Sequence, residues 1–130
     1  MTGVLEEFPV LHLPDISDPA ERKRLGPAAL NAFHRMMQAW QISDEDADRL
    51  LDGIPADGRQ LSEDQMLRIS CLLGIWKALR TLFNGPLADM WIRTPNEGRL
   101  YDGISPLRLM MSRGLPAFEK TRQHLDAMCA

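Results

Sequence analysis

The chain has 130 residues, of which 45% are hydrophobic and 25% are charged, and its formal net charge is −3. A chain of this length and composition forms one globular domain whose core needs no disulfide or metal to hold it. Its two cysteines, Cys71 and Cys129, and its three histidines lack the spacing of a metal site or a disulfide framework. We therefore expect free thiols, no bound metal and no cofactor.

The first 26 residues carry three prolines and no helical period of apolar residues. We interpret residues 1–26 as an extended or partly disordered arm. Its apolar run follows no basic residue and is too short to cross a membrane, so the sequence predicts neither a secretory signal nor a membrane span. These features favour a cytoplasmic protein.

From Pro27 onward, apolar residues recur at helical spacing as far as Trp40, which predicts an amphipathic helix. Ser43 then precedes an acidic run over residues 44–52, the pattern of a second helix with a serine cap. Gly53 marks its end.

Residues 61–83 form the clearest predicted helix, because Ser62 and Gln65 have the spacing of a capping box. Apolar residues cover more than half of its circumference. A helix of this kind belongs at the centre of a bundle.

Further helices are predicted from Pro86, from Pro106 after a cap at Ser105, and over residues 115–128. No segment alternates between apolar and polar residues with a period of two. The sequence therefore predicts an all-α, compact bundle of about five to six helices.

The sequence contains no motif of a catalytic or nucleotide-binding site, such as GxSxG, HExxH, a P-loop or GxGxxG. The acids of residues 44–52 are explained by the first turns of a helix, and His34 and His124 have no partner at ligand spacing. The methionine pairs at 36–37 and 110–111 are more typical of a core than of a binding surface. We expect no catalytic residue and no enzymatic activity.

Residues 27–60 resemble the opening of a helix-turn-helix, in which a recognition helix follows the second helix. Here "GIPADGRQ", residues 53–60, offers one arginine, a proline and two glycines in place of that helix. It also lies within residues 43–65, which hold two Lys/Arg against eight Asp/Glu, whereas residues 66–130 hold nine against five. Because cations against phosphates supply most of the affinity for DNA, the sequence disfavours DNA binding by the monomer without excluding it, and no residue is assigned to it.

Four stretches resemble the toxin-binding domain of the Xre/MbcA/ParS antitoxins: "LSEDQMLRISCLLGIWKALRTLFN", "ADMWIRTPN", "GISPLRLMM" and "TRQHLDAM". The likeness extends upstream through "AFHRMMQAWQISDEDADRLL" and covers residues 28–128. The run LSxDQxxRIS, then LGIxKAL, a tryptophan with Pro-Asn, and G-x-SPL is far more specific than a lone glycine motif.

The resemblance implies a bacterial antitoxin of a type II toxin-antitoxin system, which binds and inhibits a partner toxin that is often a RES-domain enzyme degrading NAD. It implies a helix-turn-helix-like part over residues 27–60, a toxin-binding domain over 61–130, and a homodimer. Relatives have a recognition helix where this chain has residues 53–60, and some have a tail that extends past the last helix, where this chain ends at Cys129-Ala130. Repression of its own operon and inhibition by an inserted tail are therefore left open.

The same resemblance points to a rigid bracket that displays the loop "RTPNEGRLYDG". The residues expected to build the bracket are Trp91, Pro95, Gly103, Ser105 and Pro106. Because Arg and Tyr are frequent interface hot spots and rigidly held loops carry recognition, we hypothesise toxin contacts on this loop and on the last helix. The hypothesised contacts are Arg93, Asn96, Arg99, Tyr101 and Arg122.

Two alternatives remain beside the antitoxin reading. One is a transcriptional repressor that binds DNA as a dimer despite the shortened element. The other is an orphaned helical interaction module with neither partner. A strong salt dependence of DNA binding would favour the first.

Overall fold

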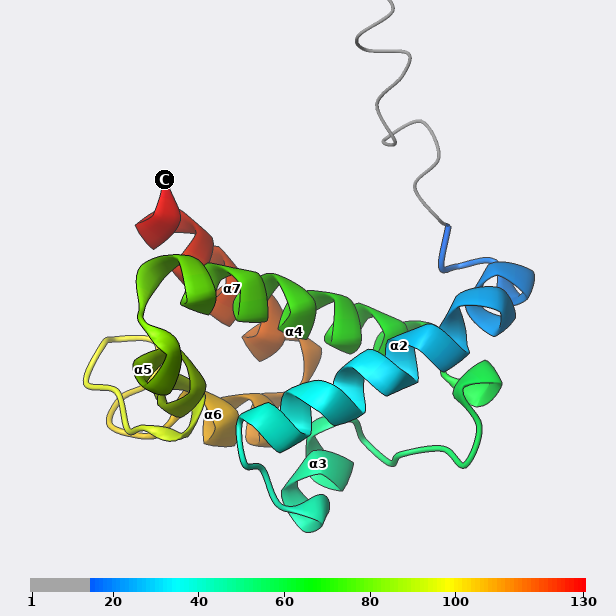
Figure 1. The fold of residues 1–130 in the computed structure, drawn as a ribbon, viewed down its shortest axis with the longest axis horizontal. Coiled ribbons are helices and arrows are strands. Elements are labelled where there is room, and N and C mark those ends of the chain that lie inside the picture. Colours follow the sequence, from blue (N-terminus) through cyan, green and yellow to red (C-terminus); the bar gives the residue numbers. More distant parts are fainter. Residues whose placement is uncertain (1–14) are drawn as a thin grey trace, which may run out of the picture.

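The computed structural model describes residues 15–130, which form an all-helical bundle (Figure 1). Its elements are α2 (Pro19–Ala39), α3 (Asp44–Leu50), the 3-10 turn η2 (Gly58–Gln60), α4 (Glu63–Leu82), α5 (Gly85–Met90), the 3-10 turn η3 (Trp91–Arg93), α6 (Pro106–Arg113) and α7 (Leu115–Cys129). The described residues contain no strand, and the prediction of an all-α bundle is confirmed. Of the helices in this range, none is long and apolar enough to cross a membrane.

Helix α2 begins at Pro19, well before the predicted helix start. Asp18 caps it, because its carboxylate accepts a hydrogen bond from the helix backbone at 3.0 Å, and Pro19 takes the first helical position. Pro27, which the sequence placed at that first position, lies inside the helix. The first turns are polar, so no apolar period marks them in the sequence. The prediction of an extended arm is therefore wrong for residues 19–26, and residues 1–14 of that arm lie outside the described part.

Helix α4 is central, as its apolar circumference predicts, and it crosses the middle of the molecule in contact with α2, α5 and α7 (Figure 1). The predicted capping box is present. Ser62 Oγ accepts a hydrogen bond from Gln65 N at 3.1 Å, and Gln65 Oε1 accepts one from Ser62 N at 3.0 Å. Leu73 departs from the predicted apolar stripes, because it is 44% exposed beside a shallow apolar groove between α2 and α4.

One hydrophobic core is shared by the helix-turn-helix-like part and the remainder of the described chain. Its largest fully buried side chains include Phe33, Trp40, Leu50, Ile69, Ile92, Tyr101 and Phe118. Trp40 of α2 packs against Trp76 of α4 with the ring centroids 5.7 Å apart. Met36, Met37 and Met110 are also buried, as their helical spacing predicted. In α7, by contrast, Met128 near the end of the helix is 49% exposed.

Arg68 joins three elements, although the sequence did not single it out. It is 9% exposed. Its Nη1 donates to Leu50 O at the end of α3 at 3.0 Å, and its Nε pairs with Asp64 at 2.5 Å. The guanidinium lies over the Phe118 ring of α7, 5.3 Å from the centroid. Because a buried guanidinium is stable only when its donors find partners, these contacts fix α3 and α7 on α4.

Candidate interaction surface

The segment from α5 to the start of α6 contains the tryptophan, proline and glycine pattern of the family-like stretch. Pro86 lies in the first turn of α5, where its missing N–H costs no helical hydrogen bond. Helix α5 continues directly into η3, and Thr94 Oγ1 donates to Met90 O at 2.8 Å. Asp89 of α5 pairs with Arg80 of α4 at 2.9 Å, which holds α5 against α4.

Residues 94–105 form a turn that is closed by its own backbone. Asn96 N donates to Ile104 O at 3.1 Å, and Gly103 N donates to Asn96 O at 2.9 Å. Asn96 Oδ1 also accepts a hydrogen bond from Gly98 N at 2.8 Å, as asparagine commonly does in turns. Gly103 has a φ of 86°, a left-handed conformation that favours glycine. These bonds make the turn a stiff bracket.

Tyr101 points into the molecule and not toward a partner. It is 1% exposed, and its ring lies edge-on to Trp91 at 5.9 Å and to His124 at 5.8 Å between centroids. Burial raises the pKa of the Tyr101 hydroxyl above its ordinary value. The placement of Tyr101 among the surface contacts is therefore wrong for this conformation. Burying an aromatic ring stabilises the fold strongly, so Tyr101 acts as the inward anchor of the turn.

Arg122 packs between helices. A Cβ at Gly74 of α4 would lie 2.3 Å from Arg122 Nε, so the arginine occupies the space that a side chain at position 74 would need. Its Nη1 lies 3.4 Å from Ser70 O, and its Nε lies 3.6 Å from the Asp126 carboxylate. The side chain is 41% exposed. Only its outer edge is open to a partner.

Arg93 and Arg99 are the hypothesised contacts that the fold leaves open. Both are exposed, and neither forms an ion pair with another residue of the 15–130 range. Arg93 lies at the end of η3, and Arg99 lies in the turn. Asn96 is half-buried and uses its side chain within the turn. Of the five hypothesised residues, these two arginines are therefore the ones presented to a partner.

An apolar surface on α5 was missed by sequence reasoning. Leu87 is 59% exposed and Met90 is 51% exposed. Met90 borders two hollows, one of about 250 Å³ beside Trp91 and one of about 400 Å³ beside Arg93. The α5 surface is defined by Phe83, Leu87, Met90, Trp91, Arg93 and Thr94. The available signal was the spacing of Leu87 and Met90, which are three residues apart and so share one helix face.

Residues 53–60, which stand where a recognition helix would be expected, form a packed turn. Its only helical element, η2, spans three residues. Gly58 approaches α2 so closely that a Cβ at Gly26 would lie 2.0 Å from Gly58 O. Asp57 caps the turn by accepting a hydrogen bond from Arg59 N at 2.9 Å. This part of the structure contains no helix long enough to read a DNA groove after α3.

Among the described residues, His34, His124 and Cys71 are packed against other side chains. In this range no three His, Cys, Asp or Glu side chains gather so that they could hold a metal ion. His34 packs edge-on against Phe33, as His124 does against Tyr101. Cys71 is buried, and burial raises the pKa of its thiol.

The chain is similar along most of its length to the uncharacterized protein y4oB of Sinorhizobium fredii (strain NBRC 101917 / NGR234). The two are 38% identical over an alignment of 121 positions, and the match covers 85% of this chain and 92% of the relative. No family model matches the chain, and no solved structure matches it.

Proposed function

We propose that this chain, which belongs to the family of the y4oB protein, is an antitoxin of a type II toxin-antitoxin system. Support comes from the stretches that resemble the Xre/MbcA/ParS toxin-binding domain, which run through α4, η3, α6 and α7. The proposed partner is a protein toxin, and a RES-domain enzyme that degrades NAD is the class favoured by the resemblance. We propose a homodimer that acts in the cytoplasm and inhibits the toxin by contact, without a reaction of its own.

One observation carries the proposal: the family-like segment displays large apolar side chains on its surface. Leu87 and Met90 are more than half exposed and adjoin the unpaired Arg93. Met, Arg and aromatic residues are enriched in protein interfaces, and an exposed apolar patch with a polar rim commonly marks one. The α5 surface has this composition.

The α5 surface is also rigidly supported from beneath. Arg80, which pairs with Asp89, lies over the Trp76 ring at 4.1 Å from its centroid, and Tyr101 packs against Trp91. Side chains that are already fixed lose less conformational entropy on binding, so a supported surface binds more tightly than a mobile one of equal area. We therefore place the toxin on the α5 surface, with its substrate cleft covered by the complex.

The test is co-expression of the full chain with the protein that the neighbouring gene encodes, for which a RES domain is the expected class. Size exclusion reports the complex and the oligomeric state, and an NAD-consumption assay reports inhibition. Co-elution with preserved NAD is the expected result. Separate elution with undiminished NAD loss would contradict the antitoxin role and leave the interaction module as the better description.

A matched pair of variants locates the interface. Met90→Asp places a charge at the centre of the α5 surface and is expected to weaken toxin binding by about tenfold or more, the effect of losing a hot spot. Leu73→Asp introduces the same charge at an apolar side chain of similar exposure on α4, outside the α5 surface, and is expected to leave toxin binding unchanged. Loss of binding in the Leu73 variant alone would move the interface to the groove between α2 and α4.

The repressor alternative lacks a comparable observation, because residues 53–60 fold into a short turn on α2. We expect no sequence-specific binding to operator DNA from the chain alone. A mobility-shift titration at several salt concentrations measures this. Tight operator binding that weakens steeply as salt rises would reverse the ranking of the two functions.

A further inference from the structure

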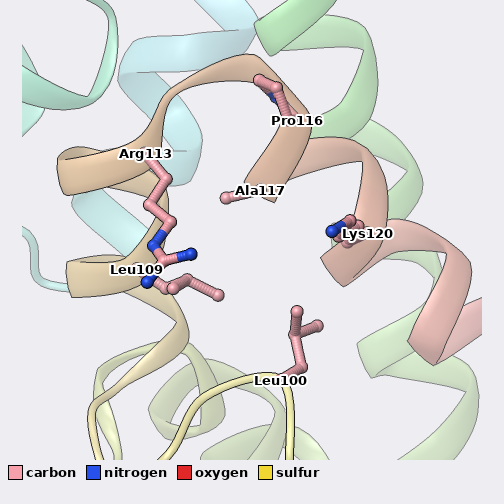
Figure 2. Close-up of a pocket in the computed structure, with 6 residues that line it drawn as sticks. All are labelled: Leu100, Leu109, Arg113, Pro116, Ala117 and Lys120. Atoms are coloured by element: carbon pink, nitrogen blue, oxygen red, sulfur yellow. The ribbon is translucent and has the colours of Figure 1, made fainter.

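A separate hollow lies between α6, α7 and the turn of residues 94–105. Figure 2 shows its lining, which consists of Leu100, Leu109, Arg113, Pro116, Ala117 and Lys120. Leu109 and Ala117 are buried and form the apolar floor. We call this hollow the α6–α7 notch, and it shares no lining residue with the α5 surface.

Two cations border the notch without a protein partner. Arg113 ends α6, Lys120 lies on α7, and both are exposed. Neither is in an ion pair with any other described residue. Residues 100–120, which span the lining of the notch, hold Arg108, Arg113 and Lys120 against Asp102 and Glu119, so this segment is net positive in a chain whose net charge is −3. The edge of the notch is therefore locally positive although the chain as a whole is acidic.

The start of α7 adds partial charge of the same sign. This helix has no side-chain cap and no acid in its first turn, whereas the first turn of α3 holds three acids. The positive end of the helix dipole is therefore not offset beside Pro116 and Ala117. Its contribution supplements the two full charges of Arg113 and Lys120.

The size of the notch limits what it can hold. Its volume is about 190 Å³, below the roughly 300–1,000 Å³ of sites for small molecules and cofactors. It fits one side chain from a partner. The apolar floor suits an aliphatic group, and guanidinium and ammonium donors at the rim suit a carboxylate.

We propose that the α6–α7 notch recognises an acidic segment of a partner protein. An aliphatic side chain of that segment enters the notch, and a neighbouring carboxylate pairs with Arg113 and Lys120. Charge complementarity favours an acidic segment over the matching edge of a second copy, because like charges facing each other repel. The site goes beyond the proposed function, since it does not require the partner to be a toxin.

The test uses the full chain and two probe peptides, acetyl-Ser-Leu-Glu-Glu-Gly-amide and its Gln-Gln counterpart. Methyl signals of Leu100, Leu109 and Ala117 are followed by NMR during each titration. The acidic peptide is expected to shift these signals and to bind about tenfold more tightly than the neutral one, because charge-assisted hydrogen bonds are stronger than neutral ones. Raising the salt concentration is expected to reduce that difference.

Variants assign the effect to the two cations. The double variant Arg113→Gln with Lys120→Gln is expected to bind both peptides equally and weakly, whereas Lys77→Gln, an exposed cation of α4 outside the notch, is expected to behave as the parent. Both sites are at the surface, so the spectra should otherwise be unchanged. The proposal is overturned by equal binding of the two peptides to the parent, by no shift, by shifts confined to other methyls, or by an equal response to inorganic phosphate.

Discussion

Two of the glycine-containing interruptions between the helices of residues 15–130 are anchored very differently. Residues 53–60 lie backbone to backbone on α2 through Gly58 and Gly26, and they offer a three-residue turn. Residues 94–105 are anchored instead by the buried ring of Tyr101, and Arg99 remains exposed. An interruption anchored by a side chain can hold its backbone away from the core. One anchored by its backbone keeps that backbone against the helix on which it packs.

The two interruptions also lie in segments of different charge. The first interruption lies within residues 43–65, with two Lys/Arg and eight Asp/Glu, and the second within residues 66–130, with nine and five. An acidic setting repels nucleic acid, whereas the second interruption carries Arg99 together with Glu97 and Asp102 and has no strong charge of either sign. The charge of the first interruption therefore disfavours a DNA partner there.

Removing the anchor of the second interruption should have the largest effect on stability. Tyr101→Ala is expected to lower the free energy of unfolding by about 3–5 kcal/mol, because it leaves a cavity where an aromatic ring was buried. Tyr101→Phe is the control, since it keeps the buried ring and removes only a hydroxyl whose polar neighbour is the Thr121 side chain, so its effect should be much smaller. Urea denaturation measures both. A loss below about 1 kcal/mol for Tyr101→Ala would mean that the turn does not depend on this ring.

Overpacking the contact of Gly58 with α2, which anchors the first interruption, should have the next largest effect on stability. Gly58→Ala is expected to cost about 1–3 kcal/mol, the usual range for overpacking, because its Cβ would lie 2.6 Å from Gly26 O. Gly85→Ala is the matched control, since a Cβ there meets nothing within 4 Å. Comparable unfolding midpoints for the two variants would show that residues 53–60 are not packed on α2 as described.

The buried ring also predicts an alkaline transition. Burial raises the pKa of Tyr101, so the folded state keeps the proton more firmly than the unfolded state does. The stability that the protonated Tyr101 contributes is fully present below the unfolded pKa of about 10. It is lost as pH rises through the folded pKa. Tyr101 is the single tyrosine, so tyrosinate absorbance follows it alone. Above the unfolded pKa of about 10, the free energy of unfolding should decline more steeply in the parent than in Tyr101→Phe.

Ionisation of the Cys71 thiol does not disturb the comparison between the parent and Tyr101→Phe. Burial also raises the pKa of Cys71, which lowers stability at high pH in the same direction. Because both proteins retain Cys71, the difference between them isolates Tyr101. Parallel pH profiles for the parent and Tyr101→Phe would contradict the raised pKa.

Much of the fold was predictable because caps and apolar periods, which mark helices, are local features of the sequence. The caps at Ser43, Ser62 and Ser105 set the starts of α3, α4 and α6 as the structure has them. The start of α2 was missed because its first turns are polar and Pro27 imitates a first helical position. Local signals therefore located helices wherever an apolar period accompanied the cap.

The site was less predictable, because exposure depends on residues far away in the sequence. Tyr101 packs against Trp91 and His124. Arg122 occupies space that is free only because Gly74 has no side chain. No local pattern distinguishes a tyrosine that anchors a turn from one that contacts a partner. The sequence analysis did not single out Leu87, and only the packed structure shows it 59% exposed.

The smallest expected effect on stability is also the most direct comparison of the two interruptions. Arg99→Ala and Arg59→Ala each remove an exposed arginine, one from the second interruption and one from the first. Both are expected to change the free energy of unfolding by less than about 0.5 kcal/mol, as is usual for surface positions. Only Arg99→Ala should weaken co-elution with the proposed toxin, and by less than Met90→Asp, because Arg99 is exposed on the second interruption but is not part of the α5 surface. If Arg59→Ala weakened the complex and Arg99→Ala did not, the first interruption would be the one that meets the partner, and the distinction between the two anchors would not determine recognition.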